Sequence, residues 1–157
     1  MASQRRTVLD GQRESTTEQR APVLYVVEDD VATLELLREV AADAGWEARG
    51  FTRIAPLRSA LENETPSLLV LDDDLPDGRG GDLARELRQD PRLAGMKLLV
   101  CTAAHPTRQA EITAWAPVVS KPFDLGQIER YFELPPTGTL PTLPDGQGRL
   151  GACAPSC

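Results

Sequence analysis

Acidic residues directly follow two short apolar segments of this 157-residue chain. Glu28 and Asp29 follow the apolar run 24–27, and Asp72 follows the run 67–71 and opens a polar turn. Carboxylates that lie close together repel one another, and a hard divalent cation such as Mg²⁺ relieves this repulsion through oxygen ligands. A carboxylate can also act as a nucleophile and accept a phosphoryl group as an acyl phosphate. Asp72 is therefore the first residue whose chemistry needs an explanation.

A lysine and a hydroxyl group follow two other apolar runs. Lys121 comes shortly after Val118 and Val119, and Thr102 ends the run 97–101. The second lysine, Lys97, precedes its run and is expected at the opposite edge. Alone, Thr102 is an ordinary strand-end hydroxyl and Lys121 a surface charge. Placed together opposite the carboxylates, they would hold the oxygens of a phosphoryl group, and this joint placement favours a functional site.

The elements that must position these residues alternate along the chain. Short apolar runs and amphipathic stretches follow one another five times, which predicts an α/β fold with a parallel sheet. In such a sheet, the carboxyl ends of the strands form one edge, where ligands bind. We expect strands at 23–27, 46–51, 67–71, 97–101 and 118–120. We expect helices at 31–44, 55–62, 81–89 and 107–115, and a last one that Asp124 caps and that ends at Phe132.

Four ordered motifs carry a resemblance to a known family. They are Val26-Val27-Glu28-Asp29-Asp30, Leu71-Asp72 with Leu75-Pro76-Asp77-Gly78, Cys101-Thr102-Ala103, and Lys121-Pro122-Phe123. In this order and at this spacing, residues 22–133 resemble the receiver domain of two-component response regulators. The resemblance implies a flavodoxin-like fold, a doubly wound five-stranded parallel sheet with helices on both faces. We expect a receiver domain at 22–134, between disordered segments at 1–21 and 135–157.

The resemblance also implies a role for individual residues. Asp72 would be the phosphoacceptor, with Thr102 as the switch hydroxyl and Lys121 as the phosphate partner. The ligands of Mg²⁺ would be the side chains of Glu28, Asp29 and Asp72 and the backbone carbonyl of Asp74. Phosphotransfer and dephosphorylation would be self-catalysed, as is usual for a phosphoacceptor rather than a conventional enzyme.

The partners that the resemblance implies are proteins. A histidine kinase or phosphotransfer protein would donate the phosphoryl group, and a downstream protein partner would respond to altered contacts; a homodimer is left open. The net charge of −7 argues against direct nucleic-acid binding, which needs clustered Lys and Arg. The chain has neither an apolar stretch of membrane-spanning length nor a secretion signal near its start, so we expect no membrane contact and a cytoplasmic location. With no effector domain after residue 134, we expect a single-domain regulator.

Two departures from the family pattern bear on signalling. Val118 stands where such domains often have an aromatic residue that is coupled to the switch hydroxyl. The stretch 102–121 is a few residues short, which implies a reduced fourth helix and an unusual partner surface. Asp74 adds a carboxylate beside Asp72, and we expect its charge to alter the lifetime of the acyl phosphate.

Several polar residues have simpler interpretations. We predict that Asp30 caps a helix, and that Asp73 and Asp77 are solvated turn residues. His105 lies in a predicted loop before Pro106, where we expect neither a metal nor a phosphotransfer role. The three cysteines are too scattered for a disulfide framework: Cys101 reads as a buried side chain, and the two in the tail, Cys153 and Cys157, supply too few ligands for a structural zinc site.

Two rival functions remain open at this point. Asp72-Asp73-Asp74 also matches the Asp-x-Asp signature of haloacid-dehalogenase phosphatases, although that motif normally lies near the start of its domain. The second rival is a degenerate receiver that acts as a phosphorylation-independent binding module. The presence of Asp72, Thr102 and Lys121 argues against that alternative.

Overall fold

A computed structural model describes residues 20–133, which form a five-stranded parallel sheet between two layers of helices. The strand order is β2-β1-β3-β6-β7, which is the order of flavodoxin-like folds. The strands of this sheet are β1 (Val23–Val27), β2 (Glu47–Phe51), β3 (Leu68–Asp72), β6 (Lys97–Thr102) and β7 (Val118–Ser120). The predicted fold class is therefore confirmed. The segments predicted to be disordered lie largely outside the described residues, as do Cys153 and Cys157.

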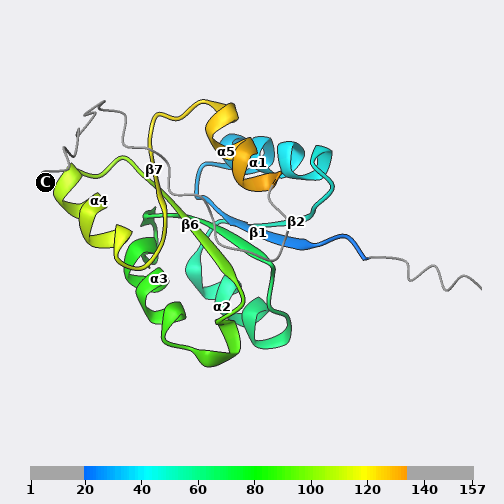
Figure 1. The fold of residues 1–157 in the computed structure, drawn as a ribbon, viewed down its shortest axis with the longest axis horizontal. Coiled ribbons are helices and arrows are strands. Elements are labelled where there is room, and N and C mark those ends of the chain that lie inside the picture. Colours follow the sequence, from blue (N-terminus) through cyan, green and yellow to red (C-terminus); the bar gives the residue numbers. More distant parts are fainter. Residues whose placement is uncertain (1–19, 134–157) are drawn as a thin grey trace, which may run out of the picture.

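The helices divide between the two faces of the sheet (Figure 1). α1 (Val31–Asp43) and α5 (Leu125–Phe132) cover one face. α2 (Ile54–Asn63), α3 (Gly80–Arg88) and α4 (Pro106–Thr113) pack on the other. None of the helices within 20–133 has the length and apolarity that crossing a membrane requires.

Alternation along the central strands builds the two halves of the core. In β1, Leu24 and Val26 pack with α1 and α5, whereas Tyr25 faces the side of α2 and α3. In β3, Val70 faces α1 and α5, and Leu71 faces the other side. Successive side chains of a strand point to opposite faces, so strands buried on both faces are apolar throughout. The same alternation decides which way the acidic residues after β3 point.

Several boundaries differ from the predicted ones. Asp72 and Thr102 are the last residues of β3 and β6 rather than the first residues of the loops. A two-stranded antiparallel hairpin, β4 (Asp74–Leu75) with β5 (Gly78–Arg79), was not predicted because two-residue strands leave no periodic signal. A 3₁₀-helix, η1 (Pro91–Leu93), precedes β6. α4 has eight residues, in line with the short fourth helix expected from the spacing.

Candidate functional site

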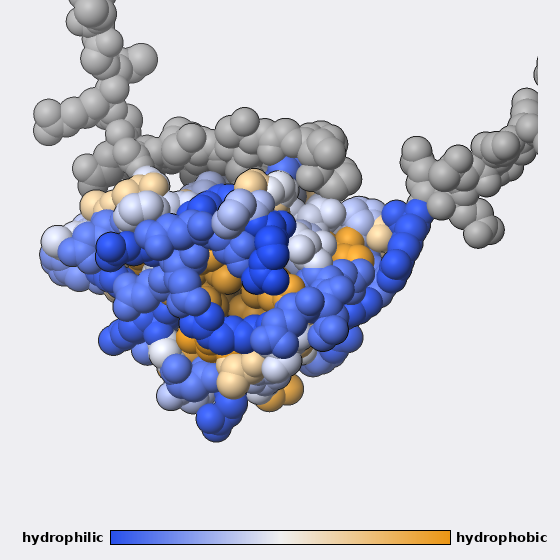
Figure 2. All heavy atoms as spheres, turned by 90° about the horizontal axis from the view of Figure 1, so that it is seen from below, coloured by the Kyte–Doolittle hydropathy of each residue, from blue (hydrophilic) through white to orange (hydrophobic). Residues whose placement is uncertain are grey.

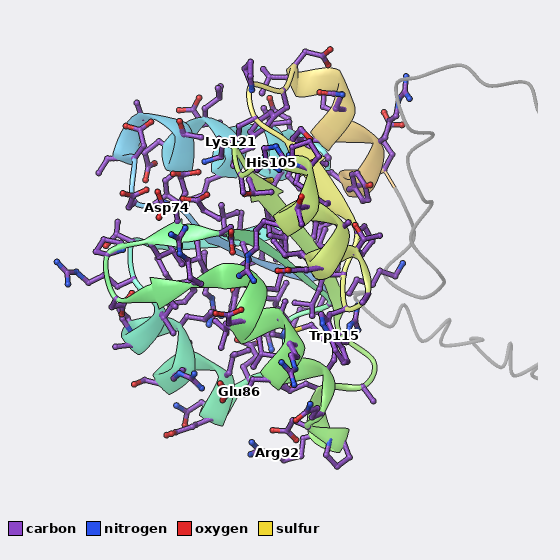
Figure 3. All side chains as sticks on the ribbon, turned by 90° about the vertical axis from the view of Figure 1, so that its left-hand side faces the viewer. Asp74, Glu86, Arg92, His105, Trp115 and Lys121 are labelled. Atoms are coloured by element: carbon purple, nitrogen blue, oxygen red, sulfur yellow. The ribbon has the colours of Figure 1, made fainter. Side chains whose placement is uncertain are left out.

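Asp72 lies at the carboxyl end of the central strand β3. Two other residues predicted for the site, Asp74 and Lys121, are labelled in Figure 3. The neighbours of Asp72 on the two flanking strands are set by the register. Val27 pairs with Leu71, which places Glu28 level with Asp72, and Asp72 itself pairs with Cys101. The side chain of Asp72 is 5% exposed. The parallel register therefore brings Glu28 and Asp72, which are 44 positions apart in the sequence, to one edge.

Lys121 bridges the two buried carboxylates of this edge. Its Nζ lies 2.7 Å from Oε2 of Glu28 and 3.1 Å from Oδ1 of Asp72. The Glu28 side chain is 4% exposed, and the Lys121 side chain is 26% exposed. The backbone N–H of Lys121 also donates to the carbonyl oxygen of Thr102, so the lysine is fixed at both ends.

Asp29 completes a cluster of three carboxylates. Glu28, Asp29 and Asp72 each offer an oxygen, and these atoms lie within 4.8 Å of one another. Asp29 is exposed, whereas the other two are buried. One lysine therefore faces three carboxylates, and the cluster keeps an excess of negative charge on its solvent side.

The surroundings shift the pKa of all three buried charged groups. Burial raises the pKa of Asp72 above its ordinary value, although Lys121 and the backbone N–H of Asp74 act in the opposite direction. Burial likewise raises the pKa of Glu28 against the effect of its hydrogen bond with Lys121. For Lys121, burial alone would lower the pKa, but Glu28 and Asp72 outweigh it and raise the pKa. A further positive charge at the site would therefore stabilise the ionised forms of both acids.

The donors present fit a magnesium ion. Carboxylate oxygens are the hard ligands that Mg²⁺ prefers, and Mg²⁺ is bound through one or two carboxylates with waters and phosphate oxygens completing the shell. Glu28, Asp29 and Asp72 supply such oxygens at mutual distances that one ion can bridge. The exposed side of the cluster, at Asp29, leaves an approach from solvent.

Thr102 reaches the same edge from the neighbouring strand. It follows Cys101, the register partner of Asp72, and pairs with Ser120 of β7. It is 2% exposed, and its Oγ1 accepts a hydrogen bond from the backbone N–H of Ala104 at 3.0 Å. The hydroxyl hydrogen of Thr102 is not used by this bond and is free to donate to an incoming oxygen.

Asp74 has a place in the site through its backbone rather than its side chain. The side chain is 86% exposed and pairs with Arg79 at 3.1 Å. The backbone N–H donates to the Asp72 carboxylate. The second aspartate of the Asp-x-Asp match therefore directs its side chain to solvent beside Arg79, away from Lys121 and Glu28.

The prediction for Asp73 was wrong, because this residue is buried rather than solvated. Its side chain is 1% exposed. Oδ1 accepts a hydrogen bond from the backbone N–H of Gly81 at 2.8 Å and lies 3.3 Å from Nη2 of Arg108. Since Asp72 faces α1 and α5, alternation turns Asp73 toward α3 and α4.

Arg108 is the partner that sequence reasoning missed. It extends from α4 to Asp73 and to Asp82 of α3, at 2.9 Å, and it also pairs with Glu111. Burial would lower the pKa of Arg108, but the hydrogen bonds with Asp82 and Asp73 raise it. The available signal was an arginine at the third position of a short helix, which is too common to single out.

The other polar predictions have mixed outcomes. Asp30 caps α1 as predicted, accepting from the backbone N–H of Thr33 at 3.0 Å. Asp77 is exposed as predicted, but its carboxylate also accepts from the first two N–H groups of α2, which sequence analysis did not foresee.

His105 and Cys101 have structural surroundings. His105 caps α4, where its Nδ1 accepts from the backbone N–H of Thr107 at 3.3 Å. Cys101 is buried as predicted, and burial raises the pKa of its thiol to about 12. Neither side chain contributes to the carboxylate cluster.

The family comparison matches most of the described chain. A family model described as the response regulator receiver domain matches residues 24–133. The structure of a response regulator receiver domain (CheY-like) from Methylobacillus flagellatus superposes with a TM-score of 0.64 at 21% identity, covering 72% of this chain and 97% of that one. At this identity, the superposition shows the fold.

Curated relatives match over a shorter segment. The transcriptional regulatory protein GltR of Pseudomonas aeruginosa is 40% identical over 81 residues, which is 52% of this chain and 34% of that protein. The phosphate regulon transcriptional regulatory protein PhoB of Rhizobium meliloti is 35% identical over 82 residues, 52% of this chain and 36% of that protein. The matched segment thus spans about a third of the length of each relative.

Proposed function

The chain belongs to the response regulator receiver domain family, and from this premise we propose that it accepts a phosphoryl group on Asp72 from a histidine kinase or phosphotransfer protein. Signalling then follows from altered contacts with a protein partner in the cytoplasm. The observation that carries this proposal is the buried Asp72 carboxylate 3.1 Å from Nζ of Lys121. A buried carboxylate beside one lysine at a strand end is positioned to attack and to be stabilised after attack.

The transfer balances with the residues present. An oxygen of Asp72 attacks phosphorus, the P–N bond to the donor histidine breaks, and a P–O bond forms. The imidazole leaves and takes a proton as it regains its neutral form. The ammonium group of Lys121 moves to contact one oxygen of the new phosphoryl group, and the Thr102 hydroxyl donates a hydrogen bond to another of its oxygens. The acidic pair Glu28 and Asp29 would hold the divalent cation.

Mg²⁺ is the cofactor we propose for this cluster, with the side chains of Glu28, Asp29 and Asp72 and the backbone carbonyl of Asp74 as its ligands. When bound, the ion neutralises charge on the phosphoryl oxygens during transfer. In its absence, Lys121 is the single cation within reach of Glu28 and Asp72 in the described part of the chain. Burial raises the pKa of both acids, and a bound cation would act in the opposite direction.

The partners in this proposal are proteins. The two curated relatives are transcriptional regulators, and the segment they share with this chain is about a third of each. The net charge of −7 supports a chain that contacts other proteins rather than nucleic acid directly.

The test is the intact mass of the protein after incubation with acetyl phosphate and Mg²⁺. We expect a phosphoryl adduct in the wild type and in Asp74→Asn, which keeps the backbone carbonyl, and none in Asp72→Ala. Different decay rates in wild type and Asp74→Asn would support an effect of the Asp74 charge on the acyl-phosphate lifetime. An adduct that persists in Asp72→Ala would overturn the assignment of the acceptor. No adduct in any folded variant, with acetyl phosphate or with a phosphorylated histidine donor, would favour the binding module.

A further inference from the structure

Asp73 stands between two residues of the proposed site and faces the opposite side of the sheet. Asp72 points toward Lys121 and Glu28, whereas the Asp73 carboxylate contacts Gly81 of α3 and Arg108 of α4. A displacement of the Asp72 backbone therefore reaches the α3 and α4 side through one peptide unit.

The backbone and side chain of Asp73 are both fastened. Its N–H donates to the carbonyl oxygen of Cys101 in β6 at 3.0 Å, and its own carbonyl accepts from Gly80 at 3.0 Å. Within the described residues, its Oδ2 is the buried side-chain atom without a hydrogen-bond partner. A buried carboxylate with one unsatisfied oxygen is costly, so its tie to Arg108 has a large effect on where this turn rests.

Glycines let α3 approach this turn closely. A Cβ on Gly80 would overlap the carbonyl oxygen of Asp72, and a Cβ on Gly81 would lie 2.6 Å from Ile112 of α4 and 3.0 Å from Oδ1 of Asp73. Little slack is left between the turn and the two helices. Motion of the turn must displace α3 or α4, because close-packed elements do not absorb shifts.

Arg108 carries the contact into a surface hollow between α3 and α4. A cavity of about 300 Å³ there is lined by Asp82, Arg85, Arg108, Ile112 and Trp115, among others. Trp115 is 38% exposed, and the guanidinium of Arg85 lies 5.4 Å from the centre of its ring. Figure 3 shows Trp115 well away from Lys121 (Figure 3). The view from below in Figure 2 shows that hydrophilic side chains cover most of this side of the molecule (Figure 2).

We propose that Asp73 and Arg108 are positioning residues that couple the acceptor Asp72 to the hollow between α3 and α4, an inference that rests on the proposed function. The ion pair holds the turn in which Asp72 and the Asp74 carbonyl must sit for phosphotransfer. In return, phosphorylation of Asp72 shifts Arg108 and the hollow around Trp115. Coupling of this kind is reciprocal in free energy, so a change at Arg108 also changes the free energy of the phosphorylated state of Asp72.

Trp115 gives this coupling a spectroscopic signal of its own. The chain has two tryptophans, and the other, Trp46, is buried at the opposite face with α5. In a Trp46→Phe background, emission reports on Trp115 alone. The decisive variant is Asp73→Asn with Arg108→Gln, which removes both charges together and leaves no single buried charge to unfold the protein.

Two variants in the same background control this experiment. Arg58→Gln removes another arginine that joins two helices, from α2 to Glu86 of α3, without reaching Asp73. Arg108→Lys keeps the positive charge near Asp73 and should retain part of the response. Circular dichroism confirms that each variant is folded. Adduct formation with acetyl phosphate and Mg²⁺ is followed by intact mass, and Trp115 emission is recorded on the same samples.

We expect the double variant to form the adduct at least about fivefold more slowly, well within the roughly hundredfold loss of rate that a misplaced reacting group can cause. We also expect Trp115 emission to change on phosphorylation in the background protein, Arg58→Gln and Arg108→Lys, and not in the double variant. Equal rates and equal emission changes in the double variant and Arg58→Gln would overturn the inference, and so would a slower adduct with an undiminished emission change. Absence of an adduct in the background protein is a failure of the proposed function, visible in the mass alone, and this inference falls with it.

Discussion

Two clusters of carboxylates with one cation each flank the end of β3 on opposite faces of the sheet. On the face of α1 and α5, Lys121 contacts two buried carboxylates, Glu28 and Asp72. On the face of α3 and α4, Arg108 contacts one buried carboxylate, Asp73. The first cluster leaves a buried negative charge unbalanced, and the second is balanced in its buried part. Under the proposed function, these adjacent aspartates would have different roles: Asp72 would carry the chemistry, and Asp73 would hold the turn in place.

The chemistry of the two cations fits this difference. The ammonium group of Lys121 is a compact charge that can move between oxygens, and the acids around it have room for a further cation. The guanidinium of Arg108 has five donors in a fixed plane, which suits it to hold several carboxylates from two helices in one arrangement. The predictions below test this division, from the largest expected effect to the smallest.

The largest effect is expected where the two clusters share a backbone. Gly80→Ala places a Cβ against the carbonyl oxygen of Asp72, so we expect the free energy of unfolding to fall by about 3 kcal/mol, the upper end for overpacking. Urea unfolding measures it. Gly95→Ala is the matched control because no atom lies within 4 Å of the added Cβ, and it should be neutral or slightly stabilising. A similar small effect at Gly80 would mean that the turn moves freely.

Breaking the supporting cluster, the ion pair of Asp73 with Arg108, should lower the free energy of unfolding by less than Gly80→Ala does. Arg108→Gln leaves the Asp73 carboxylate buried without its cation, and we expect a loss of about 2 kcal/mol, below the value for fully buried pairs since Arg108 is 29% exposed. Arg58→Gln breaks an exposed pair with Glu86 and should cost less than about 1 kcal/mol. Equal losses in the two variants, measured by urea unfolding, would contradict the role given to the buried pair.

The chemical cluster, which is Glu28, Asp29 and Asp72 with Lys121, should bind Mg²⁺. The supporting cluster around Arg108 should not. Asp29→Asn replaces one of the three clustered carboxylates by a neutral amide, and we expect Mg²⁺ affinity to fall about tenfold, which corresponds to about 1.4 kcal/mol. Isothermal titration with MgCl₂ measures this. Asp82→Asn, which removes an exposed carboxylate from the Arg108 cluster, should bind Mg²⁺ as the wild type does. An equal loss in both would show that general surface charge, not the cluster, attracts the ion.

The smallest expected effect concerns Asp72 and Asp73: replacing each by asparagine should change the free energy of unfolding in opposite directions. Burial raises the folded-state pKa of Asp72, so its ionised form destabilises the metal-free protein above that pKa, and the cost disappears as the pH falls through it. At pH 8 without Mg²⁺, Asp72→Asn should therefore be slightly more stable than wild type, and the difference should narrow toward pH 5. Asp73→Asn, which weakens the tie to Arg108, should be less stable than wild type at pH 8. Unfolding in urea with EDTA at both pH values measures these stability differences. A change of the same sign in both variants at pH 8 would contradict the different roles given to Asp72 and Asp73.

The sequence by itself determined the fold class and the members of the chemical cluster. Strands such as β1 and β3 are apolar throughout because both faces are buried, and parallel strands must bring their carboxyl ends to one edge. The sheet edge predicted from the order of the motifs therefore contains the expected side chains, which are those of Glu28, Asp72, Thr102 and Lys121.

Tertiary structure alone decided the fate of Asp73. Three consecutive aspartates look alike in a sequence, and a polar turn favours solvent for each of them. The pleat turns Asp72 and Asp73 to opposite faces, and Asp73 is buried only because Gly80 and Gly81 let α3 close over it while Arg108 arrives from α4. Such a contact depends on the packing of helices that are distant in sequence, and no local pattern encodes it.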